Sequence, residues 1–164
     1  MIKKNNDIKK VCNFSVSDGH LTVALLKYLD KEIDKNKNIV TFFDRNMEES
    51  VGRLLNNNSF DIKNKKDIKE INWKGNSNEN SRKLENDSNE KIYIVSGKED
   101  YINNVNNKIE SLYNNKLGKD VKIINCYNVS ELNNHLGKVL NKYDTMLNTT
   151  GEISMLDILK ENDF

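Results

Sequence analysis

Short apolar runs alternate along this chain with segments in which apolar residues recur every three or four positions. Continuous apolar runs of this length are typical of strands buried on both faces, and the three-to-four spacing is typical of amphipathic helices. The predicted strands cover residues 11–16, 39–43, 92–95, 121–127 and 153–159. The predicted helices cover residues 20–33, 47–55, 101–113 and 130–147.

The alternation of strands and helices predicts an α/β fold with three layers. We expect a mostly parallel sheet of about five strands with helices on both faces. A chain of 164 residues is enough for one ordinary domain and not comfortably enough for two. The prediction is therefore a single α/β domain over residues 1–164.

The segment 56–90 is the least regular part of the pattern. Ile62, Ile68, Ile71 and Trp73 allow a short strand at 69–73, but residues 75–90 contain Leu84 as their only large apolar residue. Such a stretch cannot bury enough surface to offset the entropy lost on ordering. We expect 56–90 to be an exposed or mobile insertion within the domain.

Three helix starts carry residues suited to capping. Ser17 or Asp18 precedes the first helix, Asn46 and Glu49 have the spacing of a capping box, and Ser130 precedes the last helix. Caps matter here because the chain holds 29 Asn, a single Ala and no Gln or Pro, a composition that we attribute to an AT-rich genome. Asn is a poor helix former, so these helices depend on packing more than on propensity.

Charge and apolar segments exclude two classes of partner. Lys and Arg number 26 against 25 Asp and Glu, and the two signs are interleaved, which argues against direct binding of nucleic acid. No apolar stretch is long enough for a signal peptide or a membrane span, so we expect a cytoplasmic protein with no membrane partner. Cys12 and Cys126 lie in predicted strands, where we expect buried, reduced thiols.

Candidate binding residues follow from the fold. Ligands of open α/β sheets bind beyond the carboxyl ends of the strands, which here are followed by residues 17–20, 44–45, 96–98 and 125–128. The candidate ligand-binding residues are Ser17, Asp18, Gly19, His20, Asp44, Arg45, Ser96, Asn125 and Cys126.

No complete catalytic or cofactor motif is present at these positions. The first turn has one Gly and no Lys, which excludes a P-loop, and G-x-G-x-x-G is absent. A phospho-receiver site needs an acidic pair after the first strand, where only Asp18 stands, so Asp44 and Arg45 are better explained as a pair at a helix start. His20 and His135 lack metal-ligand spacing, while a pair of Cys126 with His20 stays open. We expect no metal and no cofactor.

Several strings resemble the MEDS domain, the sensory domain of methanogen and methylotroph regulators, which is similar to a RecA/KaiC-type α/β core without a working P-loop. The string Ile-Val-Ser-Gly-Lys-Glu-Asp-Tyr at 94–101 resembles the family's strand and Ser-x-x-x-x-Tyr turn. Further resemblance lies at residues 11–33, 39–43, 121–125, 142–148 and 153–159. The resemblance implies a sensory or regulatory role without turnover.

The expected function is that of a non-enzymatic cytoplasmic regulatory domain. It would bind a small-molecule signal or a protein partner, either a kinase or a transcription regulator, and an exposed edge strand would allow a homodimer. The alternative is a small nucleotide-binding protein or enzyme whose site at the strand ends matches no known motif.

Overall fold

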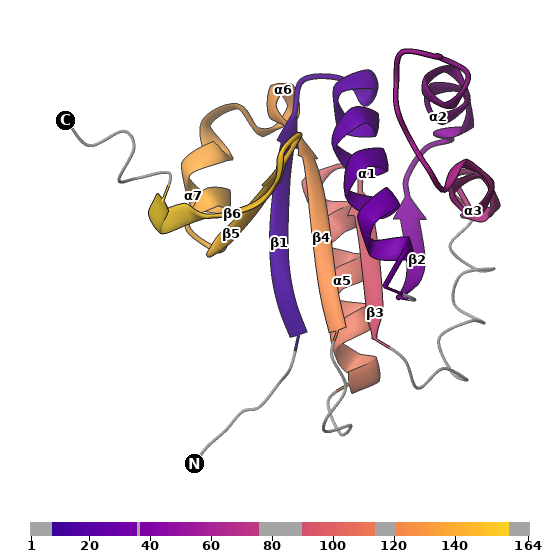
Figure 1. Ribbon diagram of the computed structural model, residues 1–164. Helices are drawn as coiled ribbons and strands as arrows, with labels where there is room; N and C mark the ends of the chain where they lie inside the picture. Colours follow the sequence, from indigo (N-terminus) through magenta and orange to yellow (C-terminus); the bar gives the residue numbers. More distant parts are fainter. Residues whose placement is uncertain (1–7, 36, 76–89, 114–120, 158–164) are drawn as a thin grey trace.

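The computed structural model describes residues 8–35, 37–75, 90–113 and 121–157 (Figure 1). The strands are β1 (Ile8–Ser15), β2 (Asn38–Phe43), β3 (Lys91–Ser96), β4 (Val121–Asn128), β5 (Thr145–Asn148) and β6 (Gly151–Ser154). The helices are α1 (Asp18–Ile33), α2 (Glu48–Leu55), α3 (Lys65–Glu70), α5 (Glu99–Tyr113), α6 (Val129–Leu132) and α7 (Leu136–Leu140), with a 3₁₀ turn at Asn133–His135.

The strands form one sheet in the order β2-β3-β4-β1-β5-β6. All neighbours are parallel except β5 and β6, which are antiparallel. The predicted α/β class with a mostly parallel sheet is confirmed, with six strands in place of about five. The longest pairing joins β1 to β4 over the full length of both, from Ile8 opposite Val121 to Ser15 opposite Asn128.

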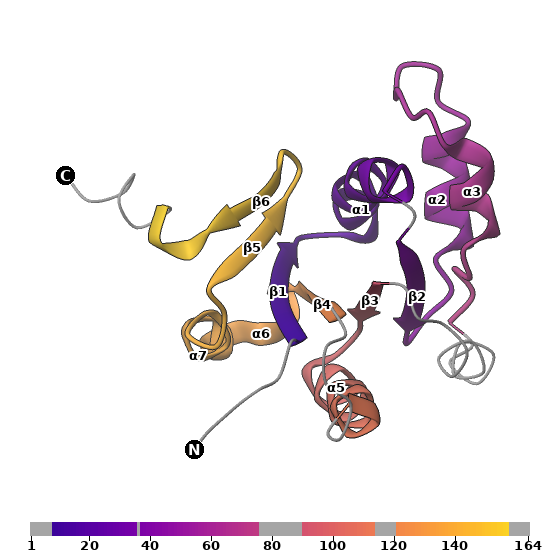
Figure 2. The same ribbon diagram turned by 60° about the horizontal axis from the view of Figure 1, so that its bottom comes forward.

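Helices cover both faces of this sheet, as Figures 1 and 2 show. On one face α1, α2 and α3 pack on a core that includes Phe43, Ile94 and Cys126. On the other face α5, α6 and α7 pack on a core that includes Cys12, Tyr93 and Ile123. Because strand neighbours in the sequence point to opposite faces, a buried parallel strand needs apolar residues at nearly every position, and β3 is buried throughout.

The first two helix starts differ in how they are capped. The Ser17 hydroxyl accepts a hydrogen bond from the backbone N–H of His20 at 3.1 Å, so Ser17 is the cap of α1. The capping box predicted for α2 is wrong. Asn46 Oδ1 accepts from the N–H of Glu48 at 2.8 Å, and Glu49 instead pairs with Arg53 one turn later.

The predicted exposed insertion is wrong for residues 60–75, which pack against α1 and β2. Ile62, Ile68 and Trp73 are buried. Ile68 lies in the short helix α3 rather than beside a strand, and the Trp73 indole stacks on Phe43 with ring centroids 5.6 Å apart. Three widely spaced apolar residues fix this segment although they make no periodic pattern. Residues 76–89 lie outside the described part of the chain.

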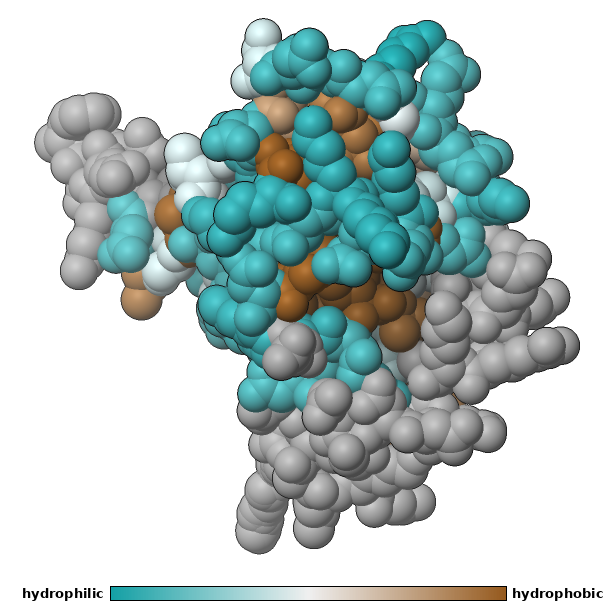
Figure 3. All heavy atoms as spheres, turned by 45° about the vertical axis from the view of Figure 1, so that its right-hand side comes forward, coloured by the Kyte–Doolittle hydropathy of each residue, from teal (hydrophilic) through white to brown (hydrophobic). Residues whose placement is uncertain are grey.

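Partly buried apolar side chains surround this segment on the β2 edge of the molecule. Figure 3 shows apolar side chains between polar ones on the side that carries β2, α2 and α3. Ile33, Ile39 and Ile71 line a hollow of about 350 Å³ there. The edge of the sheet at β2 is therefore bordered by α1 and by the end of α3.

The predicted helix 130–147 is confirmed only as far as Leu140, as α6, a 3₁₀ turn and α7 in succession. After Leu140 the prediction is wrong, because the chain enters the hairpin of β5 and β6. Tyr143 belongs to the core under α5, whereas Leu147 belongs to the core under α1. The apolar stripe of one helix packs on one face of the sheet, so a single helix could not place Tyr143 and Leu147 in cores on opposite faces. The helical segment therefore ends before Tyr143, and Leu147 belongs to β5, which lies in the sheet between the two cores. The closing strand predicted at 153–159 is wrong beyond Ser154, because β6 covers Gly151–Ser154 and residues 155–157 are helical. Residues 158 and 159 lie outside the described ranges.

Within the described ranges, no helix combines the length and the apolar character needed to cross a membrane.

The packing of α3 predicts the effect of one truncation. Ile68→Ala should lower the free energy of unfolding by about 2–5 kcal/mol, because the fully buried Ile68 side chain would leave a cavity. Leu112→Ala is the matched control, since Leu112 is 40% exposed on α5 and its loss should cost about 0.5 kcal/mol. Urea unfolding of both variants measures the difference. Equal losses in the two variants would show that 60–75 does not pack as described.

Candidate functional site

A cavity of about 660 Å³ lies at the carboxyl edge of the sheet. It is bordered by the ends of β1, β3 and β4, by the residues that follow β2 and β3, and by the first residues of α1 and α6. Its lining residues are Ser15, Asp18, Asp44, Arg45, Ser96, Gly97, Lys98, Tyr127, Asn128, Ser130 and Glu131. We call it the carboxyl-edge cavity.

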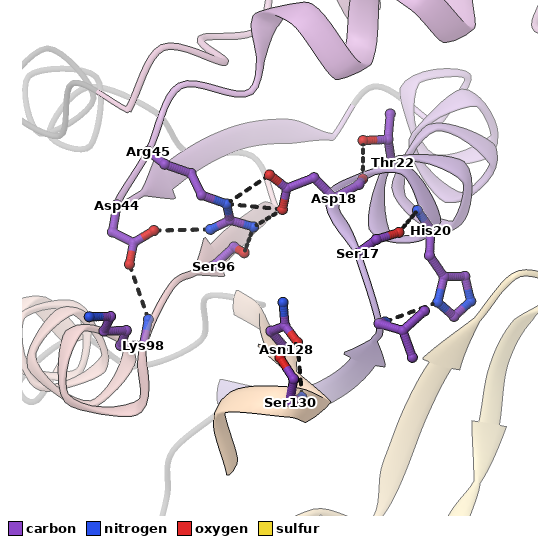
Figure 4. A network of polar contacts seen from close by, with 11 residues as sticks. Ser17, Asp18, His20, Thr22, Asp44, Arg45, Ser96, Lys98, Asn128 and Ser130 are labelled. Carbon is purple, nitrogen blue, oxygen red and sulfur yellow. Dashed lines mark hydrogen bonds and ion pairs between the residues drawn. The ribbon is translucent and has the colours of Figure 1, made fainter. Parts of the chain in front are cut away.

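The strand order explains why the cavity lies at this place. β1 and β4 are neighbours, but the chain leaves β1 into α1 on one face and leaves β4 into α6 on the other. Two connections that diverge to opposite faces leave a crevice between them, and such switch points are where open α/β sheets bind ligands. The crevice here separates Asp18 from Asn128 (Figure 4).

Arg45 occupies the side of the cavity nearest to α1. Its Nε and Nη2 donate to Asp18 Oδ1 at 3.0 and 2.7 Å, and Nε also contacts Oδ2 at 3.2 Å. Its Nη1 donates to Asp44 Oδ1 at 3.0 Å, and Nη2 donates to Ser96 Oγ at 3.1 Å. One guanidinium thus joins the turn after β1 to the ends of β2 and β3, and we call this set of contacts the Arg45 clamp.

The charges of the clamp largely compensate one another. The side chains of Arg45, Asp18 and Asp44 are 33%, 42% and 25% exposed. Burial alone would lower the pKa of Arg45, but its hydrogen bonds to the two carboxylates outweigh burial and raise that pKa above its ordinary value. Arginine therefore stays charged at every physiological pH. With three acidic lining residues against two basic ones, the cavity carries a formal charge of −1.

Gly97 allows Asp44 to complete the clamp from the other side. Asp44 Oδ2 accepts a hydrogen bond from the backbone N–H of Lys98 at 3.1 Å. A Cβ on Gly97 would stand 2.6 Å from that same oxygen and 2.7 Å from a ring carbon of Tyr101. Only glycine leaves room for the Asp44 carboxylate to lie against the start of α5.

Four of the predicted binding residues come together in the cavity, namely Asp18, Asp44, Arg45 and Ser96. Ser17 and Gly19 belong to the first turn of α1, where Ser17 serves as the cap. His20 is exposed and turned away from Arg45, and its Nδ1 accepts from the N–H of Val16 at 3.3 Å (Figure 4). The prediction that His20 contributes to this site is not supported by its position.

Asn125 lies inside the sheet rather than at its edge. β4 continues to Asn128, so Asn125 is 1% exposed and faces α5. Its Nδ2 donates to Asn106 at 3.0 Å and to the Tyr143 hydroxyl at 2.9 Å, and the Tyr143 and Tyr127 hydroxyls are 2.6 Å apart. A buried network with these partners fixes the packing of α5 and of the segment before β5.

Cys126 is buried as well, beneath α1. Burial raises the pKa of its thiol to about 12, so the thiolate is scarce at neutral pH. The Cys126–His20 pair is therefore wrong, because one residue is in the core and the other is exposed on the surface. Cys12 faces the opposite side of the sheet, and both cysteines are free and buried as predicted.

Seven lining residues were not among the sequence candidates. Gly97, Lys98, Tyr127 and Asn128 lie in segments that were named as following the strands, whereas Ser15, Ser130 and Glu131 lie outside those segments. Ser15 was assigned to the interior of a strand, although β1 ends on it. Ser130 was assigned as a helix cap, but its N–H and hydroxyl donate to Asn128 Oδ1 at 3.0 and 2.7 Å. The Asn-x-Ser spacing after β4 is the local signal that could have identified this turn.

Among the residues that the structure describes, no three His, Cys, Asp or Glu side chains are grouped so that they could hold a metal ion. Searches against models of protein families, curated proteins and solved structures found no match for this chain.

The contact between Gly97 and Asp44 gives a test of the clamp. Gly97→Ala should lower the free energy of unfolding by about 1–3 kcal/mol, because the methyl group displaces Asp44 or Tyr101. Gly137→Ala is the control, because nothing lies within 4 Å of a Cβ at that helical position. That change should be neutral or stabilising by up to about 1 kcal/mol. Chemical denaturation of both variants is the measurement, and a neutral Gly97→Ala would contradict the described position of Asp44.

Proposed function

We propose that this chain is a non-enzymatic regulatory domain that binds a small polar molecule in the carboxyl-edge cavity. The observation that carries the proposal is the Arg45 clamp beside a cavity of about 660 Å³. A volume of this size is in the range of small-molecule sites. The role is the one implied by the resemblance to the MEDS sensory domain, and the two free thiols favour a reducing compartment such as the cytoplasm.

The chemistry of the lining favours recognition over turnover. A general base or a nucleophile needs a carboxylate, imidazole or thiolate that is poised to react. Asp18 and Asp44 are both engaged by Arg45, His20 is turned away, and the thiol of Cys126 is buried and protonated. The remaining lining groups are hydroxyls, an amide and the exposed side chains of Lys98 and Glu131, a set that suits recognition of a polar ligand.

The clamp also offers a route by which binding can be communicated. The carbonyl oxygens of Phe43 and Arg45 lie 2.9 Å from the position of a Cβ on Gly75, so Gly75 packs directly on the backbone of the clamp. The Trp73 carbonyl accepts from the N–H of Met47 at 2.7 Å. A ligand that moves Arg45 therefore acts on the segment that holds Trp73. Such a ligand shifts the protein between two conformations only if it binds them with different affinity.

Thermal unfolding and the fluorescence of Trp73, the single tryptophan of the chain, test this proposal together. The full chain is screened against nucleosides, nucleotides, sugars, amino acids and carboxylic acids. A ligand at one hundred times its Kd should raise Tm by about 5–10 °C. It should also change the Trp73 emission and stay chemically intact over hours.

The variant Arg45→Gln should weaken both responses, and Ser96→Ala provides a milder change at the same contact if the first variant unfolds. Arg53→Gln is the control, because Arg53 is an exposed arginine whose ion pair within the described part of the chain is with Glu49 on α2. Conversion of the ligand to product, abolished in Arg45→Gln, would show instead that the chain is an enzyme. A screen without any stabilising compound would also refute the proposal.

A further inference from the structure

The floor of the carboxyl-edge cavity holds a serine hydroxyl that has no partner among the described residues. Ser15 is 4% exposed and lines the cavity, and no described side chain or backbone group forms a hydrogen bond with its Oγ. This hydroxyl is not among the fully buried unpaired side-chain atoms of the described residues, which are Asn13 Oδ1, Asn38 Nδ2 and the Tyr101 hydroxyl, so it is open to the cavity. Since the unpaired hydroxyl borders a cavity, Ser15 is placed to bind a group that enters from outside.

Two further lining side chains, Ser96 and Asn128, can donate hydrogen bonds to a ligand. Ser96 is 1% exposed and accepts from Arg45, so its own proton is available to a ligand. The Asn128 Oδ1 is occupied by Ser130, which leaves its amide nitrogen to donate, and Figure 4 shows that nitrogen directed across the cavity toward Asp18. The hydroxyls of Ser15 and Ser96 and the amide of Asn128 thus offer hydrogen-bond donors at the ends of β1, β3 and β4.

The acceptors are the carboxylates of the clamp. A carboxylate has about four acceptor positions. Asp18 accepts three contacts from Arg45, and Asp44 accepts one from Arg45 and one from Lys98. Both carboxylates therefore retain capacity. Planar carboxylate and amide groups match the spacing of two hydroxyls on adjacent carbons, each of which donates one hydrogen bond and accepts another.

Charge argues against a phosphate or carboxylate ligand. The guanidinium of Arg45 is already balanced by two carboxylates, and the whole lining carries a formal charge of −1. An anion would meet this negative field with Lys98 as the only basic residue of the lining outside the clamp, and Lys98 is exposed. An uncharged ligand with several hydroxyls avoids this repulsion.

We infer, on the basis of the proposed function, that the ligand presents a vicinal diol without a phosphate group, held between Ser15 and the carboxylates of Asp18 and Asp44. Such a diol is carried by a free sugar or cyclitol and by the ribose of a nucleoside. The cavity volume of about 660 Å³ accommodates either.

Isothermal titration of the full chain with paired compounds tests this inference and separates the two sources of the diol. The sugar arm compares methyl α-D-glucopyranoside with its 3-deoxy form, which keeps no two hydroxyls on adjacent carbons. The nucleoside arm compares adenosine and guanosine with their 2′-deoxy forms and with AMP. Binding is expected in one arm, with an affinity about ten-fold lower for the deoxy compound, because loss of one hydroxyl leaves buried polar groups unpaired. AMP should bind no more tightly than adenosine.

Ser15→Ala should weaken binding of the diol about five-fold while leaving Tm nearly unchanged. Ser111→Ala is the control, because the Ser111 hydroxyl donates only to Asn107 within α5, away from the cavity. Equal binding of diol and deoxy compounds, or an unaltered affinity in Ser15→Ala, overturns the inference. Tighter binding of AMP or of a carboxylate also overturns it but leaves a ligand-binding function intact. Failure of every compound, in this set and in the wider screen, refutes both.

Discussion

A single guanidinium holds the ends of three parallel strands together. Arg45 is charged at all physiological pH values, and its partial burial is tolerable only because carboxylates contact it on two sides. Without that cation, Asp18 and Asp44 would face each other as two like charges. The shape and polarity of the carboxyl-edge cavity therefore depend on the position of this one side chain.

The same strand end supports the packing of the segment between β2 and β3 that holds Trp73. The backbone at Phe43 and Arg45 meets Gly75, and Met47 donates to the Trp73 carbonyl. Trp73 then stacks on Phe43 and joins the core under α1. The cavity and the segment that holds Trp73 are thus joined through the backbone that follows β2. A ligand with differential affinity for two positions of Arg45 would act on both.

The sequence predicted the parts of the fold that are periodic. The strands ending at Phe43 and Ser96 were recognisable because buried parallel strands are continuously apolar, and α1 was recognisable from its spacing. The segment that buries Ile62, Ile68 and Trp73 has no period, so only tertiary contacts show that it packs.

Prediction of the site was limited by strand lengths and by long-range pairing. Strand ends suggested Asp18, Asp44 and Arg45 as neighbours, but no local pattern shows that Arg45 selects Asp18 across the sheet edge. Asn125 was placed at the edge although it lies within the predicted strand 121–127, and β4 continues three residues beyond it, to Asn128. An error of three residues along a strand moves a residue from the cavity into the core.

The coupling between Asp18 and Arg45 tests the central claim most directly. A double-mutant cycle of Asp18→Asn and Arg45→Gln, read by urea unfolding, should give an interaction energy of about 1 kcal/mol. Partial exposure of the pair weakens the interaction, whereas the contacts of two guanidinium nitrogens with one carboxylate strengthen it. The exposed pair Glu49 and Arg53, with side chains 77% and 78% exposed, is the reference and should give about 0.3–0.5 kcal/mol. A coupling between Asp18 and Arg45 no larger than that of the reference pair would contradict the account.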